Sequence, residues 1–109
     1  MKLYDAIEVP NDRGTAISHY LKRNNCPINI SGYNILIAVI SLAVDHPELK
    51  SKELFMKFQE LVSGSPTNWL SPYKAATYCL KCAGYEDKIY VFIKECACQL
   101  MFMSEKDVL

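Results

Sequence analysis

Residues 35–44 form the longest apolar run of the chain, ILIAVISLAV, and only Ser41 interrupts it. The length of the run and its lack of alternation favour a helix over a strand, although its β-branched residues are typical of strands. A helix that is apolar on nearly all faces is usually buried at the centre of a domain. A membrane-spanning helix needs about 20 apolar residues, so we expect no membrane association. The run therefore predicts a central, buried helix over residues 31–44.

Four further helices are predicted from turn signals and helical spacing. The first covers residues 15–23, with Thr15 as its N-cap, after a loose arm over residues 1–12. The others cover residues 50–62, 71–83 and 86–103. In the third helix, the apolar positions are Leu54, Phe55, Phe58, Leu61 and Val62. In the last, they are Ile89, Phe92, Ile93, Cys96, Leu100 and Met103. The predicted fold class is all-α: one domain over residues 13–109, a compact bundle of about five helices.

The third and fourth helices are joined by the strongest turn signal in the chain, SGSPTN at residues 63–68. Ser71 and Pro72 follow it as a predicted N-cap and a first-turn proline. Two helices joined by a short polar turn form the arrangement of a helix-turn-helix. Many small helical domains contain such a pair, so the arrangement alone does not predict DNA binding.

The charge of the chain is zero overall, from 12 basic and 12 acidic residues. This balance excludes a strongly basic nucleic-acid-binding domain as a description of the whole molecule. The charges are unevenly distributed, however, because no acidic residue occurs between Ser63 and Tyr85. Lys74 and Lys81 therefore give this segment a local charge of +2 in a neutral protein.

The five cysteines are an odd number, and the N-terminus does not have the pattern of a secretory leader. We therefore expect a cytoplasmic protein with reduced thiols. Cys79 and Cys82 form a C-x-x-C pair, but a structural zinc site needs a second pair, and Cys96 and Cys98 lie about 200° apart on a helix. No metal, no cofactor and no enzymatic activity are expected, because the two histidines are isolated and no catalytic motif is present.

A family resemblance begins at residues 20–42, YLKRNNCPINISGYNILIAVISL. Pro27, Ile28, Ile30, Gly32 and Tyr33 stand in the order in which a Pro-containing loop and a Gly-Tyr pair enter an apolar helix in a known family. The segment resembles the start of the C-terminal effector domain of the sporulation response regulator, stage-zero sporulation protein A. The helix order is similar over residues 13–100. The resemblance implies a bacterial transcription regulator of sporulation type, whose fourth helix would be the recognition helix for duplex DNA.

The chain departs from this family mainly in the recognition helix and in the turn before it, which would contact DNA. The family's recognition helix is rich in Arg and His, whereas residues 71–81 contain two Lys and neither of the others. The turn before this helix is a few residues longer than the family's, and Ser31 replaces the Lys that usually precedes the Gly-Tyr pair. A chain of 109 residues has room for the effector part alone, so phosphorylation control through a receiver domain is not expected within it.

The candidate DNA-contacting residues lie on one side of the fourth helix, opposite its predicted core side of Tyr73, Ala76, Leu80 and Ala83. In this hypothesis, the lysines meet phosphates or guanine acceptors, and the serine and tyrosine meet the sugar-phosphate backbone. The alternative interpretation is a solvated helix face with two ordinary lysines. The candidate residues are Ser71, Lys74, Thr77, Tyr78 and Lys81.

A second hypothesis is that the chain keeps the fold but acts as a dimerisation or protein-interaction module. The last helix has a weaker apolar face, which Glu95 interrupts, and exposed apolar patches tend to mark interfaces. Packing of this face against the N-terminal arm would explain it equally well. The candidate partner-surface residues are Val91, Cys98 and Phe102.

Overall fold

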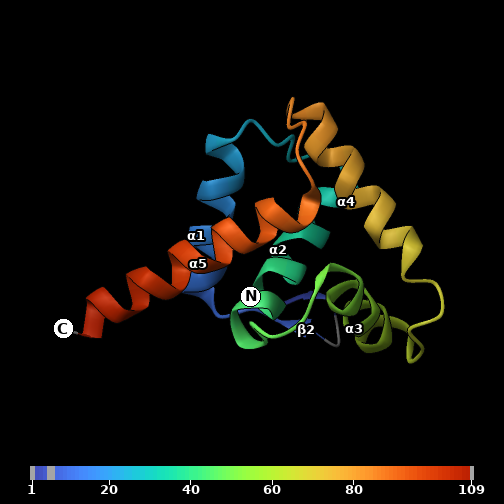
Figure 1. Ribbon diagram of the computed structural model, residues 1–109, viewed down its shortest axis with the longest axis horizontal. Coiled ribbons are helices and arrows are strands. Elements are labelled where there is room, and N and C mark those ends of the chain that lie inside the picture. The colour runs from blue at the N-terminus through green and yellow to red at the C-terminus, as the bar shows by residue number, and fades with distance from the viewer. Residues whose placement is uncertain (1, 5–6, 109) are drawn as a thin grey trace.

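A computed structural model describes the backbone of residues 2–4 and 7–108 and the side chains of residues 7–101. In this part of the chain there are five helices and one small hairpin, in agreement with the predicted all-α bundle (Figure 1). The hairpin consists of β1 (Lys2–Tyr4) and β2 (Ile7–Glu8). The helices are α1 (Asn11–Arg23), α2 (Ser31–Asp45), α3 (Ser51–Ser63), α4 (Leu70–Cys82) and α5 (Ile89–Val108).

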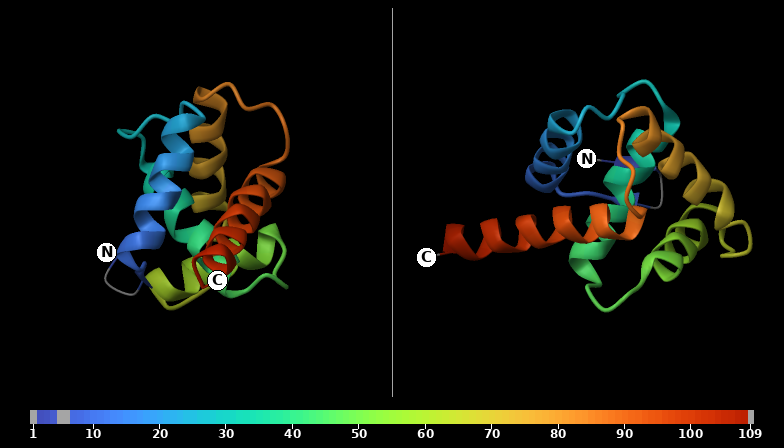
Figure 2. Two further views of the ribbon diagram at one scale, coloured as in Figure 1. Left: turned by 90° about the vertical axis from the view of Figure 1, so that its left-hand side faces the viewer. Right: turned by 45° about the horizontal axis from the view of Figure 1, so that its top comes forward.

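Helix α2 lies at the centre of the bundle and contacts each of the other four helices (Figures 1 and 2). Every residue from Ile35 to Ala43 is buried, as predicted for a helix that is apolar all round. Ser41, the only polar residue of this run, accepts a hydrogen bond from Nη1 of Arg13 at 3.1 Å. The same guanidinium nitrogen lies 3.0 Å from Oδ1 of Asp45, so Arg13 joins α1 to the C-terminal half of α2.

The N-terminal segment differs from the predicted loose arm. The two short strands pair antiparallel, and both Ile7 and Val9 are buried in the core. Helix α1 begins at Asn11, four residues before the predicted start, and Thr15 lies exposed within the helix and is not its cap. The prediction was wrong because burial of Ile7 and Val9 fixes this segment, and because Asp12 favours a first helical turn through the helix dipole.

Several helix ends agree with the sequence signals, and others shift by a few residues. Gly64, with φ of 85°, is the C-cap of α3, and Gly84, with φ of 84°, follows the last residues of α4. Helix α4 begins one residue early, so Ser71 lies in its first turn and is not the N-cap, as Trp69 takes that position. Helix α5 begins at Ile89, three residues later than predicted.

Two predicted core residues of α3 are exposed. Leu54, Phe55 and Phe58 are buried as expected, but Leu61 is 37% and Val62 is 41% exposed. The two exposed residues belong to the last turn of α3, next to the connection with α4. Periodicity assigns a face to a helix but does not show how far along that face its neighbours extend.

Helix α5 is the longest element, and its C-terminal part extends away from the rest of the bundle (Figures 1 and 2). Its N-terminal half packs on α2 and α1 through the predicted apolar stripe, with Leu100 half-buried at the end of the stripe. The side chain of Met103 lies outside the described residues. None of the helices in the described part of the chain is both long enough and apolar enough to cross a membrane.

Candidate nucleic-acid interface on α4

The position of α4 depends on a close crossing with the N-terminus of α2. A β-carbon added at Gly32 would lie 2.1 Å from the carbonyl oxygen of Ala75 and 2.9 Å from the β-carbon of Cys79. No side chain fits in this space, so only glycine allows the two helices to approach so closely. The glycine of the Gly-Tyr pair thus fixes the separation between the central helix and α4.

Tyr33, the second member of the pair, joins α2 to α1. Its hydroxyl group shares a hydrogen bond of 2.6 Å with the Ser18 hydroxyl and also donates to the Ser18 carbonyl oxygen at 3.3 Å. The tyrosine itself is buried. Two successive residues therefore connect α2 to α4 on one side and to α1 on the other.

An aromatic cluster holds α4 against α3. The Tyr73 ring packs edge-on against Phe55, with ring centroids 5.3 Å apart, and against Trp69, with centroids 5.9 Å apart. The ammonium group of Lys52, in the first turn of α3, lies 5.4 Å from the centre of the Trp69 ring. These contacts set the angle between the two helices of the candidate helix-turn-helix and place a third lysine near the start of α4.

The buried side of α4 is rotated relative to the predicted one. Ala76 and Leu80 are buried as expected, while Tyr73 and Ala83 are half-buried at its edge. Pro72 and Cys79 are also buried, and sequence reasoning had not assigned them to the core. Cys79 is fully buried where α4 meets Gly32. The rotation comes from the glycine crossing, which draws the Cys79 side of α4 towards α2.

The opposite side of α4 presents four of the five predicted DNA-contacting residues to solvent: Ser71, Lys74, Tyr78 and Lys81. Thr77 differs, because it is half-buried and its hydroxyl group donates a 2.8 Å hydrogen bond to the Tyr73 carbonyl oxygen. Its hydrogen is thus used within the helix, and only its lone pairs are available to a ligand. Thr77 is a weaker candidate than the other four.

The lysines of this face form no ion pair within the described part of the chain. Neither Lys74 nor Lys81 forms a salt bridge with any side chain that the structure describes. Unpaired ammonium groups on an exposed helix face are available to external anions. The Tyr78 hydroxyl group between them is in hydrogen-bond contact with the Cys82 thiol, which raises the pKa of Tyr78.

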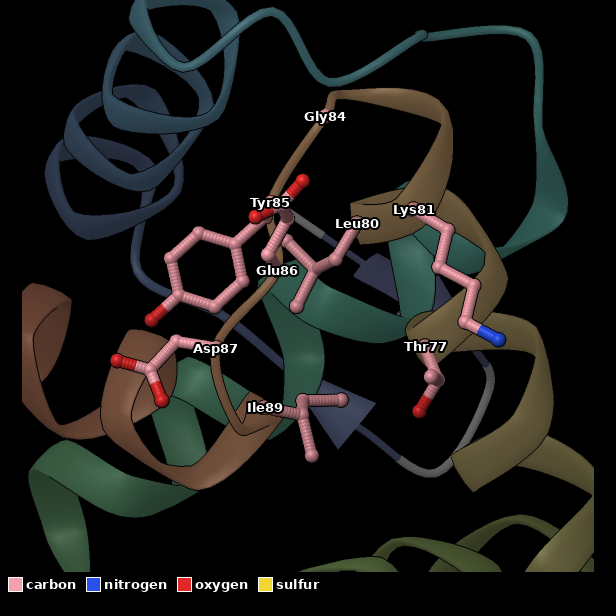
Figure 3. Close-up of a pocket in the computed structure, with 8 residues that line it drawn as sticks. All are labelled: Thr77, Leu80, Lys81, Gly84, Tyr85, Glu86, Asp87 and Ile89. Atoms are coloured by element: carbon pink, nitrogen blue, oxygen red, sulfur yellow. The ribbon is translucent and has the colours of Figure 1, made fainter.

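Acidic side chains limit the positive face at the C-terminal end of α4. A cavity of about 370 Å³ lies between α4 and the segment that leads into α5. Figure 3 shows Thr77 and Lys81 on the α4 side of this cavity and Glu86 and Asp87 on the connecting segment. The positive character therefore belongs to the N-terminal and middle part of the α4 face, around Lys74.

Apolar side chains border the same face at its other end. Leu70, in the first turn of α4, is 49% exposed, and Leu61 and Val62 are exposed across the connection. Sequence reasoning did not predict this exposed apolar group, because Leu61 and Val62 fit the core stripe of α3 and Leu70 lay before the predicted start of the fourth helix. Exposed leucine and valine side chains therefore lie at the α3–α4 connection, and exposed lysines lie further along α4.

The predicted partner surface on α5 is only partly described. Cys98 is exposed and Val91 is half-buried, while the side chain of Phe102 lies outside the described residues. Val91 and Cys98 are seven positions apart, so both lie on one side of the helix. Cys96 is buried on another side, as the 200° separation predicts, and burial raises its pKa to about 12.

Within the described residues, no group of three or more His, Cys, Asp or Glu side chains is arranged to hold a metal ion. All five cysteines are free thiols. Comparisons of the chain with protein-family models, with curated proteins and with solved structures found no match.

Proposed function

We propose that the protein is a transcription regulator that binds duplex DNA through α4, with α3 and α4 as a helix-turn-helix. The observation that carries the proposal is the exposure of Ser71, Lys74, Tyr78 and Lys81 on one face of α4. The resemblance of residues 27–33 to the sporulation effector domain supports it. The close crossing at Gly32 also supports it, because the Gly-Tyr pair of the resemblance then positions the candidate recognition helix.

Each residue has a distinct role in this proposal. Lys74 and Lys81 contact phosphates or the acceptor groups of guanine in the major groove, and Ser71 contacts a phosphate at the start of the helix. Tyr78 contacts the sugar-phosphate backbone through its exposed ring and hydroxyl group. Lys52 adds a positive charge from the first turn of α3. This set recognises phosphates more than base edges, so we expect low sequence specificity from a single domain.

The expected affinity follows from the number of positive side chains. Two or three lysines release few counterions, so binding by one copy of the chain is weak and falls moderately with salt. A dissociation constant of about 10⁻⁴ to 10⁻⁶ M is typical of such sequence-independent binding at physiological salt. Glu86 and Asp87, near the C-terminal end of α4, lower the affinity further by repelling phosphates.

Fluorescence anisotropy with labelled duplex DNA at low and moderate salt tests the proposal. Lys74→Ala and Lys81→Ala should each weaken binding, while Lys22→Ala, at an exposed lysine on α1, should not. Circular dichroism before each titration establishes that the variants are folded. Absence of binding at low salt, or equal binding by all three variants, would contradict the proposal.

The second candidate function is a protein-interaction module, and the exposed leucine and valine side chains at the α3–α4 connection favour it. In that case, Leu70→Glu abolishes association with the partner, and the lysine variants retain it. Size-exclusion chromatography with light scattering tests the version in which the partner is a second copy. A monomer at all concentrations, unchanged by Leu70→Glu, would contradict that version.

A further inference from the structure

A groove of about 310 Å³ lies between α1 and α5, two helices that pack against each other (Figure 1). On α1, Ala16, Tyr20 and Arg23 line it at helical spacing, and on α5, Cys96 and Leu100 line it one turn apart. Its described lining residues all belong to these two helices, so the groove is separate from the candidate DNA-contacting face of α4.

The floor of the groove is apolar. Cys96 is buried, while Ala16, Tyr20 and Leu100 are half-buried and present part of their surface to the groove. The Tyr20 ring is held by an edge-on contact with Phe92, with ring centroids 5.3 Å apart. Ligand sites in proteins have volumes of about 300–1,000 Å³, so this groove is large enough to cover the hydrocarbon part of a small molecule.

Hydrogen-bond donors gather near one end of the groove. The guanidinium carbon of Arg23 lies 5.9 Å from the centre of the Tyr20 ring, which holds the positive charge beside the apolar floor. No ion pair or side-chain hydrogen bond engages Arg23 within the described part of the chain, so its N–H groups are available to a ligand. His19 precedes Arg23 by one helical turn and lines the same groove.

The charges around the groove favour a ligand with one negative charge. Burial raises the pKa of Tyr20 and raises that of Cys96 to about 12, and the Arg23 guanidinium opposes both shifts. A positive charge that favours the ionised forms of these groups also favours an anion beside them. Asp12 lines the groove three helical turns from Arg23, and Glu95 raises the pKa of Tyr20 further. These two carboxylates disfavour a ligand with several negative charges.

We propose that the α1–α5 groove binds a small monocarboxylate with an apolar body. The carboxylate of the ligand accepts hydrogen bonds from the Arg23 guanidinium, whose planar fork matches it, and His19 supplies a further donor. The hydrocarbon part lies over the Tyr20 ring and extends between Ala16 and Leu100. The bound ligand contacts both helices, so it ties α1 to α5 close to the point where α5 extends away from the bundle (Figure 2).

Calorimetric titration of the full chain with octanoate, together with amide NMR spectra, tests the proposal. We expect saturable binding with a dissociation constant of about 10⁻⁴ to 10⁻³ M, because the ligand is small and the groove is open to solvent. Amide signals of the groove residues in α1 and α5 should shift, and those of the α3–α4 connection should not. Shifts confined to that connection, or no saturable binding at millimolar octanoate, would overturn the proposal.

Two further probes with the same chain length test the charge of the ligand. 1-Octanol should bind at least about tenfold more weakly than octanoate, because it lacks the charge-assisted hydrogen bonds to Arg23. Octylamine should also bind more weakly, because the Arg23 guanidinium repels its ammonium group. If either probe bound as tightly as octanoate, the groove would not select a carboxylate, and the proposal would be wrong.

Two variants locate the two parts of the ligand. Arg23→Gln should weaken octanoate binding about tenfold, and the matched control Lys22→Gln, at an exposed neighbour that does not line the groove, should not. Ala16→Leu should also weaken it about tenfold, because the larger side chain fills the groove while Arg23 stays in place. Amide spectra of the free variants establish that they are folded.

Equal octanoate affinity in Arg23→Gln and in the unaltered protein would overturn the assignment of Arg23 to the carboxylate. The measurements require no DNA, so their outcome is independent of the proposed DNA binding.

Discussion

Gly32 lies so close to Ala75 that a β-carbon at position 32 would be 2.1 Å from the carbonyl oxygen and 2.7 Å from the carbonyl carbon of Ala75. Both obstructing atoms belong to the backbone of α4, so a side-chain rotation cannot relieve the clash. The central helix and the candidate recognition helix can be this close only while position 32 has no side chain. The Gly-Tyr pair is therefore a structural motif for the placement of α4, whatever α4 binds.

We expect Gly32→Ala to destabilise the fold by about 3 kcal/mol, because α2 and α4 must separate to admit the new methyl group. Alanine is otherwise favoured over glycine in a helix, so the sign of the effect discriminates between a close crossing and helix propensity. Urea denaturation measures it. The control is Asn34→Ala, at an exposed position on the same helix, which should change stability by less than about 0.5 kcal/mol. A Gly32→Ala protein as stable as the unaltered one would contradict the crossing.

Tyr33→Phe tests the other half of the pair. The substitution removes the hydroxyl group that bonds to Ser18 and should lower stability by about 1 kcal/mol. The half-buried Ser18 hydroxyl and the Ser18 carbonyl oxygen each lose a hydrogen-bond partner. Tyr90→Phe is the matched control, since the Tyr90 hydroxyl forms no hydrogen bond to the described part of the protein. Thermal denaturation of both variants gives the comparison, and equal melting temperatures would show that the Tyr33 hydroxyl contributes nothing.

The central helix and the number of helices could be predicted from sequence because they follow from local patterns. Residues 35–44 offer no polar face, so the segment is stable only in the core, where Ile35 to Ala43 are buried and Val44 is half-buried. The glycines after α3 and α4 mark helix ends through their own backbone preference. In both cases, the deciding interaction is with water or with residues a few positions away.

The features that sequence reasoning missed depend on contacts between distant segments. Ile7 and Val9 enter the core as two residues of a short segment, too short for a strand signal. The burial of Cys79 depends on Gly32, which lies 47 positions earlier. The exposure of Leu61, in the last turn of α3, depends on how far the elements packed against α3 extend along that helix. For the candidate site, periodicity predicted the exposed side of α4, but not the acidic boundary at Glu86 and Asp87.

If α4 binds DNA, the salt dependence of binding counts its phosphate contacts. The logarithm of the binding constant falls linearly with the logarithm of salt concentration, with a slope of about −0.9 for each phosphate neutralised. Lys74→Ala should therefore reduce the slope by about 1, and Lys74→Arg should preserve it. Anisotropy titrations at several salt concentrations measure both slopes. An unchanged slope in Lys74→Ala would mean that Lys74 does not meet a phosphate.

The buried thiols predict how stability changes with pH in the presence of a reductant. Burial raises the pKa of Cys26 and of Cys96 from 9.0 to about 12. Between these values, the unfolded chain loses the thiol protons while the folded protein keeps them, so the unfolded state binds fewer protons. Stability is therefore independent of these thiols below about pH 9 and falls as the pH rises from there towards 12. Tyr20, whose pKa is also raised by burial, acts in the same direction.

Above about pH 9, the free energy of unfolding should fall by about 1 kcal/mol per pH unit for each buried thiol. Urea denaturation at about pH 8.5 and about pH 10.5 can resolve this difference. Cys96→Ala should make the dependence shallower, because one of the two thiols no longer titrates. Cys98→Ser should leave it unaltered, because Cys98 is exposed in the folded protein. An equal pH dependence in Cys96→Ala and in the unaltered protein would show that the Cys96 thiol titrates alike in the folded and unfolded states.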